Sequence, residues 1–303
     1  MTARTKGDLR GFTIRNENAF GTFYTSGTSV YGGTIQTLDP TGGKSFSEDV
    51  TDGSYKFATP VVTGMSAGYK VKFRYPISSD WQTWITRTIG GLTGIGTLRD
   101  ITPFSSVIKV ASDELISWLG CKVDSLTIAS SKIGELLDIT ATIIAMYETE
   151  SSTTTFTDAE GGSYIFAEAA RPSYVPLSDN TPWQYSTDNG ATWSSCDHKT
   201  WELQITRGLQ SDASNVGGLP LDAGLSIIPT KCEVQFKFSQ LSKSSEWDTL
   251  KRSGMTDLQF KKTIDTKVVL LTGGYLLPDN MPSRSQNTYD ETIVVKIQDI
   301  TVT

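Results

Sequence analysis

Tyr69-Lys-Val-Lys-Phe-Arg-Tyr75 alternates apolar with charged residues, and Asp80-Trp-Gln-Thr-Trp-Ile85 follows it after a polar break. A related pattern returns as Cys232-Glu-Val-Gln-Phe-Lys-Phe238 and then Glu246-Trp-Asp-Thr-Leu250. In each copy the alternation predicts a strand, and the acid–Trp–polar–Thr–apolar segment predicts a short helix. The alignment pairs these residues: Val71 with Val234, Phe73 with Phe236, Tyr75 with Phe238 and Trp81 with Trp247. A unit repeated at this distance predicts two related domains.

The composition limits the class of protein. The chain has 303 residues, a net charge of −6 and 37% hydrophobic residues, which is enough for one large or two ordinary domains. No apolar run approaches the roughly 18 residues of a membrane helix, and Met1–Asp8 carries no apolar stretch. We therefore expect no membrane insertion and no signal peptide. The negative charge argues against a surface that clamps nucleic acid, but it is compatible with a passage along which DNA slides.

The chain is predicted to be mainly β. Strands are expected at 107–111, 115–128, 136–146, 201–206, 232–238, 267–277 and 291–302, because apolar and polar residues alternate there. Two helices are expected at about 79–89 and 244–252, each with a Ser or Asp at its start and a Gly after its end.

The expected domain organisation follows the repeat. Residues 1–150 form the first domain, 151–182 a connector rich in Ser, Thr and Pro, and 183–303 the second domain. Gly11–Arg15 is interpreted as the counterpart of Trp201–Ile205, and 133–142 as that of 289–298. A stretch at about 20–60 is interpreted as an insertion that lacks a core-forming pattern and orders only when subunits stack.

The sequence carries little that resembles a reactive site. The single histidine, His198, adjoins Cys196 and Asp197, but neighbours along a strand point to opposite faces, so an exposed turn histidine is the favoured interpretation. Cys121, Cys196 and Cys232 lack the spacing of metal ligands and are expected to be free, partly buried thiols in a reducing compartment. The glycines near position 90 follow a helix instead of preceding one, unlike a phosphate loop. We expect no enzyme, and no catalytic, cofactor-binding or metal-binding residue.

One local motif is Ser186-x-Asp188-x-Gly190-x-x-Trp193, which resembles the Asp-box hairpin of sialidases and other β-propellers. Asp-Asn-Gly at 188–190 is a tight-turn sequence, and Tyr185 and Trp193 are expected to pack across the two strands. In propellers the box recurs once per blade, whereas here it occurs once. A structural hairpin is therefore favoured over glycan recognition.

Two hairpins carry a family resemblance. Trp118-Leu-Gly-Cys-Lys-Val-Asp-Ser-Leu-Thr-Ile128, followed by Ile133–Ile144, resembles the Gly-Cys-Lys-Val-x-Ser-Leu-Thr-Ile hairpin of tail tube proteins from head-tailed viruses. Residues 201–209, 218–220 and 227–238 resemble the later half of that family, so the resemblance spans roughly residues 60–303. The 20–60 stretch and the Asp-box-like hairpin lie outside the pattern.

The resemblance implies a fold and an assembly. It implies two tandem tail-tube-type β-sandwich or barrel domains, each with one short flanking helix, and long hairpins that join a β-barrel between subunits. The strands near 105–146 and 256–300 are the candidates for those hairpins. A chain with two such domains is expected to form trimeric, pseudo-hexameric rings, with hexameric rings as the alternative if the halves merge into one fold.

The resemblance also implies partners and a location. The tape measure protein and double-stranded DNA would occupy the lumen, and tail terminator and baseplate or tip proteins would bind the tube ends. The subunit would be made in the host cytoplasm and reside in the virion tail. Two other classes stay open: a carbohydrate-binding or sialidase-like β protein, and a surface-layer-type structural protein.

Overall fold

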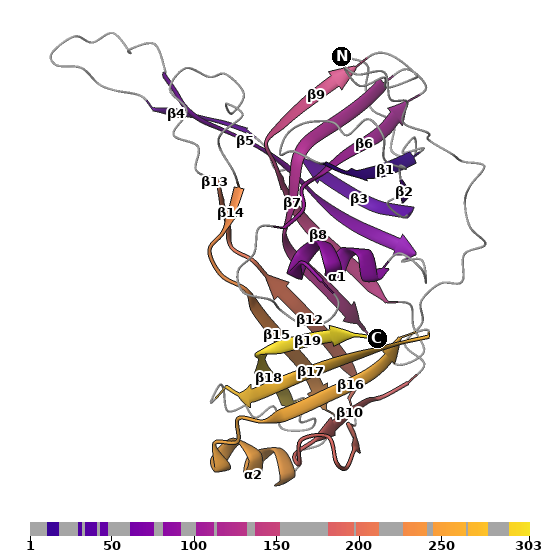
Figure 1. The fold of residues 1–303 in the computed structure, drawn as a ribbon, viewed down its shortest axis with the longest axis vertical. Coiled ribbons are helices and arrows are strands. Elements are labelled where there is room, and N and C mark those ends of the chain that lie inside the picture. The colour runs from indigo at the N-terminus through magenta and orange to yellow at the C-terminus, as the bar shows by residue number, and fades with distance from the viewer. Residues whose placement is uncertain are drawn as a thin grey trace, which may run out of the picture.

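The computed structural model describes the following residues: 11–17, 30–31, 34–40, 43–47, 61–75, 81–91, 101–111, 114–131, 137–151, 181–196, 198–211, 227–240, 245–264, 266–277 and 291–303. They form a mainly β protein with antiparallel pairing and two short helices (Figure 1). The segment expected to be a connector falls almost entirely outside these ranges.

The first half of the chain contributes ten strands and helices. They are β1 (Gly11–Asn16), β2 (Val30–Tyr31), β3 (Thr34–Pro40), β4 (Gly43–Ser47), β5 (Val61–Tyr75), α1 (Trp81–Ile89), β6 (Phe104–Ala111), β7 (Glu114–Ser130), β8 (Asp138–Ala145) and β9 (Tyr147–Ser151).

The second half contributes eleven. They are β10 (Trp183–Ser186), β11 (Ser194–Cys196), β12 (Thr200–Thr206), β13 (Leu209–Ser211), β14 (Ile227–Pro229), β15 (Glu233–Gln240), α2 (Ser245–Ser253), β16 (Leu258–Ile264), β17 (Lys267–Leu276), β18 (Glu291–Ile297) and β19 (Asp299–Val302).

Both predicted helices are confirmed. Each ends at a glycine in the left-handed region, Gly90 with φ 85° and Gly254 with φ 64°, a conformation that lacks a steric penalty only for glycine. The Gly90 amide donates to the Thr86 carbonyl at 2.8 Å and closes the last turn of α1. Most predicted strands are confirmed within a few residues, but 291–302 is wrong as one strand, because the chain bends at Gln298 between β18 and β19.

The strand pairings of the first half recur in the second. Pairs β1–β2, β1–β6, β3–β5, β5–β8, β6–β7, β7–β8 and β7–β9 correspond to β10–β11, β10–β16, β12–β15, β15–β18, β16–β17, β17–β18 and β17–β19. The counterpart of Gly11–Arg15 is therefore β10, and the counterpart of β12 is β3. The prediction that matched Gly11–Arg15 with Trp201–Ile205 is wrong.

A bend with positive φ fixes the register of this internal repeat. Gly120 (φ 61°) and Gly273 (φ 65°) lie in β7 and β17, where each strand passes from one set of partners to another. Just before each glycine a carbonyl accepts a backbone hydrogen bond: Leu119 from Met146 at 2.8 Å and Thr272 from Gln298 at 3.1 Å. These two bends therefore occupy equivalent places in the two halves.

Counting from these bends corrects the alignment made from the sequence. Ile143, three residues before Met146, pairs with Tyr69, whereas Val295, three residues before Gln298, pairs with Phe236. Tyr69 therefore occupies the place of Phe236, and by the same count Val71 occupies that of Phe238. The predicted match of Val71 with Val234 is wrong by four residues.

The stretch at 20–60 is not wholly an insertion without core-forming pattern. Within it, β3 pairs with β5 from Thr34 to Pro40, and Leu38 packs against the hydrophobic core. Two register shifts, between Thr34 and Ile35 and between Ile35 and Thr37, interrupt the alternation. The expectation that this stretch lacks core-packing residues is therefore wrong for β3.

Candidate functional site: a polar sheet face that crosses both halves

Among the strands that the structure describes, one pairing joins the two halves of the chain. β7 pairs with β12 from Ser125↔Thr206 to Ser130↔Trp201, antiparallel and without a register shift. A single sheet consequently runs in the order β3-β5-β8-β7-β12-β15-β18-β17 through both halves (Figure 1). We call the pairing of β7 with β12 the internal joint.

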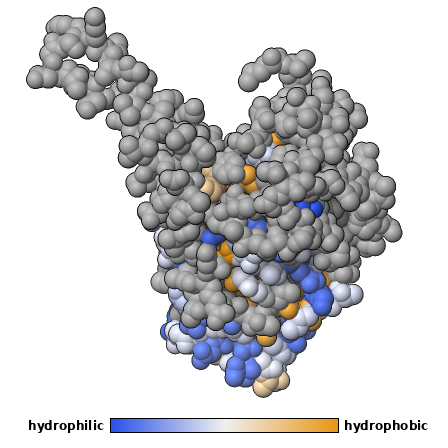
Figure 2. Space-filling view, turned by 45° about the horizontal axis from the view of Figure 1, so that its top comes forward, coloured by the Kyte–Doolittle hydropathy of each residue, from blue (hydrophilic) through white to orange (hydrophobic). Residues whose placement is uncertain are grey.

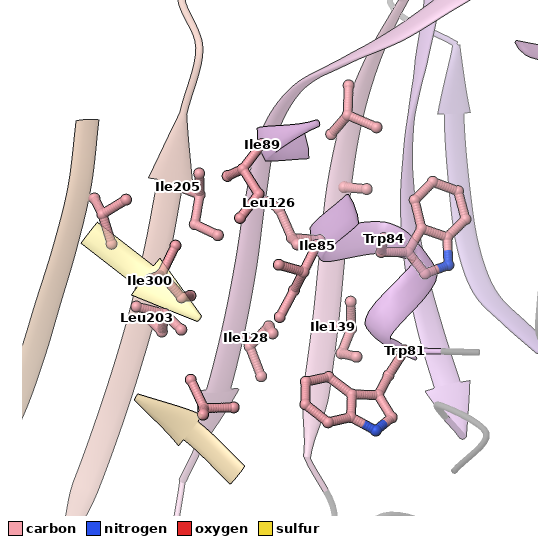
Figure 3. Packing of buried hydrophobic residues seen from close by; sticks show 14 of the residues in the cluster. Trp81, Trp84, Ile85, Ile89, Leu126, Ile128, Ile139, Leu203, Ile205 and Ile300 are labelled. Carbon is pink, nitrogen blue, oxygen red and sulfur yellow. The ribbon is translucent and has the colours of Figure 1, made fainter. Parts of the chain in front are cut away.

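The core side of the internal joint is shared by both halves. Figure 3 shows Ile85 and Ile89 of α1 beside residues of β7 and β12, and all belong to one buried cluster. Leu126, Ile128, Leu203 and Ile205 are at most 1% exposed. Each buried aliphatic side chain contributes about 1.5–3 kcal/mol, so the joint is apolar packing as well as backbone pairing.

The opposite side of this sheet, here called the polar face, carries the residues that alternate with the core. They include Lys70, Lys72, Thr127, Asp138, Thr140, Thr142, Glu202, Gln204, Thr206, Glu233, Gln235, Lys237 and Lys296, all exposed or half-buried. Strand alternation explains the division, because successive side chains point to opposite sides of a sheet. Figure 2 shows one side of the molecule, where coloured hydrophilic atoms gather at the lower end.

Two lysines of the polar face are paired with acids. Lys72 Nζ lies 2.9 Å from Asp138 Oδ2, and Lys237 Nζ lies 3.1 Å from Glu202 Oε1. These pairs are half-exposed, so each contributes at most about 1 kcal/mol to stability. Their main effect is electrostatic, because a lysine beside a carboxylate offers a weak site for phosphate.

His198 is buried instead of exposed. The side chain is 6% exposed, and its Nδ1 lies 2.8 Å from the carbonyl oxygen of Cys196. The expectation of an exposed turn histidine is therefore wrong. Asp197 lies outside the described residues, so the structure brings together only two members of the sequence cluster.

The three cysteines are free, as predicted, with Cys121 and Cys196 buried and Cys232 half-buried. Burial raises the pKa of Cys121 far above its ordinary value, although Ser106 hydrogen bonding opposes the shift. A thiol in that state is not a nucleophile at neutral pH. Among the described residues no group of three His, Cys, Asp or Glu side chains could hold a metal ion.

A polar cluster at the bend of β7 was not foreseen from the sequence. Glu17 is 2% exposed, and its carboxylate accepts hydrogen bonds from Ser105 Oγ and, at 3.0 Å, from the Gly120 amide. Nearby, Tyr69 Oη donates to Ser106 Oγ at 2.8 Å, and burial raises the pKa of Tyr69 well above its usual value. The cluster ties β1, β5, β6 and β7 together at the point where β7 changes partners. Its sequence signal was Gly120 inside a predicted strand of unusual length.

The Asp-box-like hairpin is closed by its own hydrogen bonds. Ser186 Oγ accepts from the Gly190 amide at 2.9 Å and donates to Asp188 Oδ1 at 2.7 Å. Asp188 also accepts from the Thr192 amide and hydroxyl, at 2.9 and 2.5 Å. Asn189 (φ 58°) and Gly190 (φ 84°) adopt the left-handed turn that the sequence predicted.

The aromatic residues of this hairpin have separate partners. Tyr185 packs on Trp247 at 4.9 Å between ring centroids, and Lys261 Nζ lies 4.0 Å from the centroid of Trp193. Because its polar atoms serve the turn, the hairpin fits a structural role. Packing of Tyr185 on Trp193 stays a prediction.

Replacing Asp188 with alanine is expected to lower the melting temperature by a few degrees, because three hydrogen bonds of the turn lose their acceptor. The hydrogen bonds from Thr192 and Ser186 lower the pKa of Asp188 to about 2, below the value near 4 of an unfolded chain. The stabilisation is therefore complete above about pH 4 and lost as the pH falls towards 2. Thermal unfolding at several pH values measures this, with Thr187→Ala as the neighbouring control. An equal difference between wild type and Asp188→Ala at pH 2 and pH 7 would contradict it.

Comparison with known proteins gives no family. No protein-family model matches the chain, and no curated protein matches its sequence. Within the described ranges no helix is long and apolar enough to cross a membrane, since both helices have nine residues.

Proposed function

We propose that this chain is a structural subunit that polymerises into stacked rings, as the tail tube of a head-tailed virus that conducts the genome into the host. The observation that carries the proposal is the continuous sheet through both halves, with one side packed on the core and one side polar. A sheet of this kind closes into a barrel when further copies extend it, and closure removes its unpaired edges.

The chemistry of the polar face fits the lining of such a conduit. Hydroxyl and amide side chains alternate there with lysines, and Lys72 and Lys237 are each paired with an acid. DNA binding grows with the number of phosphates that cations neutralise, so paired lysines bind weakly and allow DNA to slide. The net charge of −6 also weakens the binding of DNA, because it repels the phosphates.

The proposed partners follow from the resemblance described above. They are further copies of the chain, the tape measure protein and double-stranded DNA in the lumen, and terminator and baseplate or tip proteins at the tube ends. The two halves have the same pairing pattern, so each chain would supply two tandem tube-type domains. Three chains would then complete a pseudo-hexameric ring.

Electron microscopy of the purified, assembled protein tests this proposal. Tubes of uniform width whose rings contain three copies, with six-fold pseudo-symmetry, are the expected result. Six identical copies per ring would contradict the trimer. A persistent monomer that binds a glycan array would contradict the tube itself and favour the carbohydrate-binding alternative.

A further inference from the structure

We propose that the internal joint is the template for the contact between copies, so that β3 and β4 of one copy add to the sheet of another copy at the end of β17. The inference rests on the proposed function and identifies the two edges and their register. It starts from the equivalence of β3 with β12 and of β17 with β7, which the pairings and the two glycine bends define.

Among the described strands, both edges lack on one side the partner that their counterparts have. β12 pairs with β15 on one side and with β7 on the other, whereas β3 pairs with β5 alone among the described strands. At the opposite end of the sheet, Tyr275 and Leu276 of β17 pair with β18 on one side. In the internal repeat, the edge strand β3 corresponds to β12 and the edge strand β17 corresponds to β7. The two free edges are therefore the counterparts of the two strands that form the internal joint.

Tyr275 at the end of β17 is exposed. Among the residues that the structure describes, it is the one exposed large hydrophobic side chain, at 36%. Tyr275 lies two residues after Gly273, and Lys122 lies two residues after Gly120. Tyr275 pairs with Lys296, two residues before Gln298, and Lys122 pairs with Ile144, two residues before Met146, so the two positions are equivalent. Lys122 is 1% exposed. This position of the repeat is therefore buried at Lys122 in β7 and exposed at Tyr275 in β17.

The backbone contact of the internal joint continues past the end of β12. In the internal joint the Arg207 amide donates to the Asp124 carbonyl at 2.7 Å, and the Leu209 amide donates to Asp124 Oδ1 at 2.7 Å. The chain leaving β12 therefore crosses β7 two residues beyond Lys122. A second copy of the strand equivalent to β12 would cross β17 in the same way, two residues beyond Tyr275.

The repeat supplies the residues of the expected contact. Asp124 and Leu277 each lie four residues after a bend glycine. Two pairs define the matching residues of the strands that would make the contact: Thr206 pairs with Glu233, and Gly43 pairs with Ser66. Arg207 is the next residue after Thr206, and Lys44 is the next residue after Gly43. Because Tyr69 occupies the place of Phe236, Ser66 occupies that of Glu233. Lys44 of one copy is therefore expected opposite Leu277 of the next, and a basic residue recurs at the position of Arg207.

The geometry of this contact determines the kind of assembly. Two different edges meet, so the contact is head-to-tail, and a head-to-tail contact makes a closed ring or an open helix and not an isologous dimer. The repeat makes the internal joint and the contact between copies turn the sheet by the same angle, as a pseudo-symmetric ring requires.

Disulfide cross-linking tests the register. Lys44→Cys and Leu277→Cys are combined in a chain with Cys232→Ser, which removes the half-buried native thiol. Mild oxidation is expected to give a ladder of covalent multimers on a non-reducing gel, and neither single variant is expected to exceed a dimer. The matched control combines Lys44→Cys with Thr256→Cys, an exposed residue after α2. Equal ladders in both pairs, or none in the first, would overturn the inference.

Charge at the edge provides the second measurement. Tyr275→Asp is expected to reduce the assembled fraction about tenfold or more in sedimentation, as loss of a buried interface tyrosine does. Its melting temperature should stay near that of wild type, because the side chain is exposed in a single copy. Thr256→Asp adds the same charge elsewhere and should leave assembly unchanged. Normal assembly of Tyr275→Asp contradicts the inference.

The outcomes separate this inference from the proposed function. Uniform tubes that form despite Tyr275→Asp would support the proposed tube and contradict the proposed contact between edges. A ladder of cross-linked multimers, formed by chains that assemble into open fibres, would support the proposed contact between edges and contradict the proposed tube. A wild-type chain that remains monomeric at every concentration would contradict both.

Discussion

Replacing Trp247 with alanine is expected to lower the free energy of unfolding by about 3–5 kcal/mol, the range for a buried tryptophan. The ring is 2% exposed and holds α2 against the second half of the sheet. Its centroid lies 5.2 Å from that of Phe238, 4.9 Å from that of Tyr185 and 6.2 Å from that of Phe260, with the last pair stacked at 12°. Alanine leaves a cavity that three aromatic rings cannot fill without moving.

Urea unfolding followed by circular dichroism measures the loss. Arg252→Lys is the matched control on the same helix, because residue 252 is exposed and keeps its charge; its effect should stay within about 0.5 kcal/mol. A loss below about 1 kcal/mol for Trp247→Ala would show that α2 does not depend on this ring.

Replacing Ile205 with aspartate is expected to cost about 4 kcal/mol or more, because it places an unpaired carboxylate in the core side of the internal joint. Ile205 is fully buried, and its backbone pairs with Leu126 on one side and Val234 on the other. The strand is central, so the new charge can reach water only if β12 leaves β7 or β15. The expected result is separation of the two halves as well as lower stability.

Limited proteolysis and denaturant unfolding together measure this effect. Gln204→Asp is the matched control, since the neighbouring residue lies on the polar face and should change stability by less than about 1 kcal/mol. Equal losses for the two variants would contradict the assignment of Ile205 to the core side.

The sequence was sufficient to predict the mainly β class, both helices and most strands. Those predictions depend on local signals: a glycine in the left-handed region at 90 or 254, and alternation of apolar and polar residues. The absence of reactive groups was inferred in the same way, from residue types and spacing.

The register of the repeat could not be predicted, because a pattern of period two looks the same after any even shift. Matching Val71 to Val234 satisfied the alternation as well as matching Tyr69 to Phe236. Only the contacts of the bends at Gly120 and Gly273 distinguish the two alignments. β3 was missed for a related reason, since two register shifts disturb its alternation.

The break at Gln298 could have been found. Ile293, Val295 and Ile297 are buried at odd positions, whereas Ile300 and Val302 are buried at even positions. The change of phase indicates that the chain turns over between them, which one continuous strand cannot do. His198 offered no comparable signal, because its burial depends on the packing of distant strands around it.

The internal joint also bears on the kinetics of assembly. Because β7 and β12 belong to one chain, they meet at an effective concentration that the chain sets, independent of how dilute the protein is. A ring of such chains needs only half as many encounters between separate molecules as a ring of single-domain subunits with the same number of domains. Duplication thus lowers the protein concentration at which a ring can close.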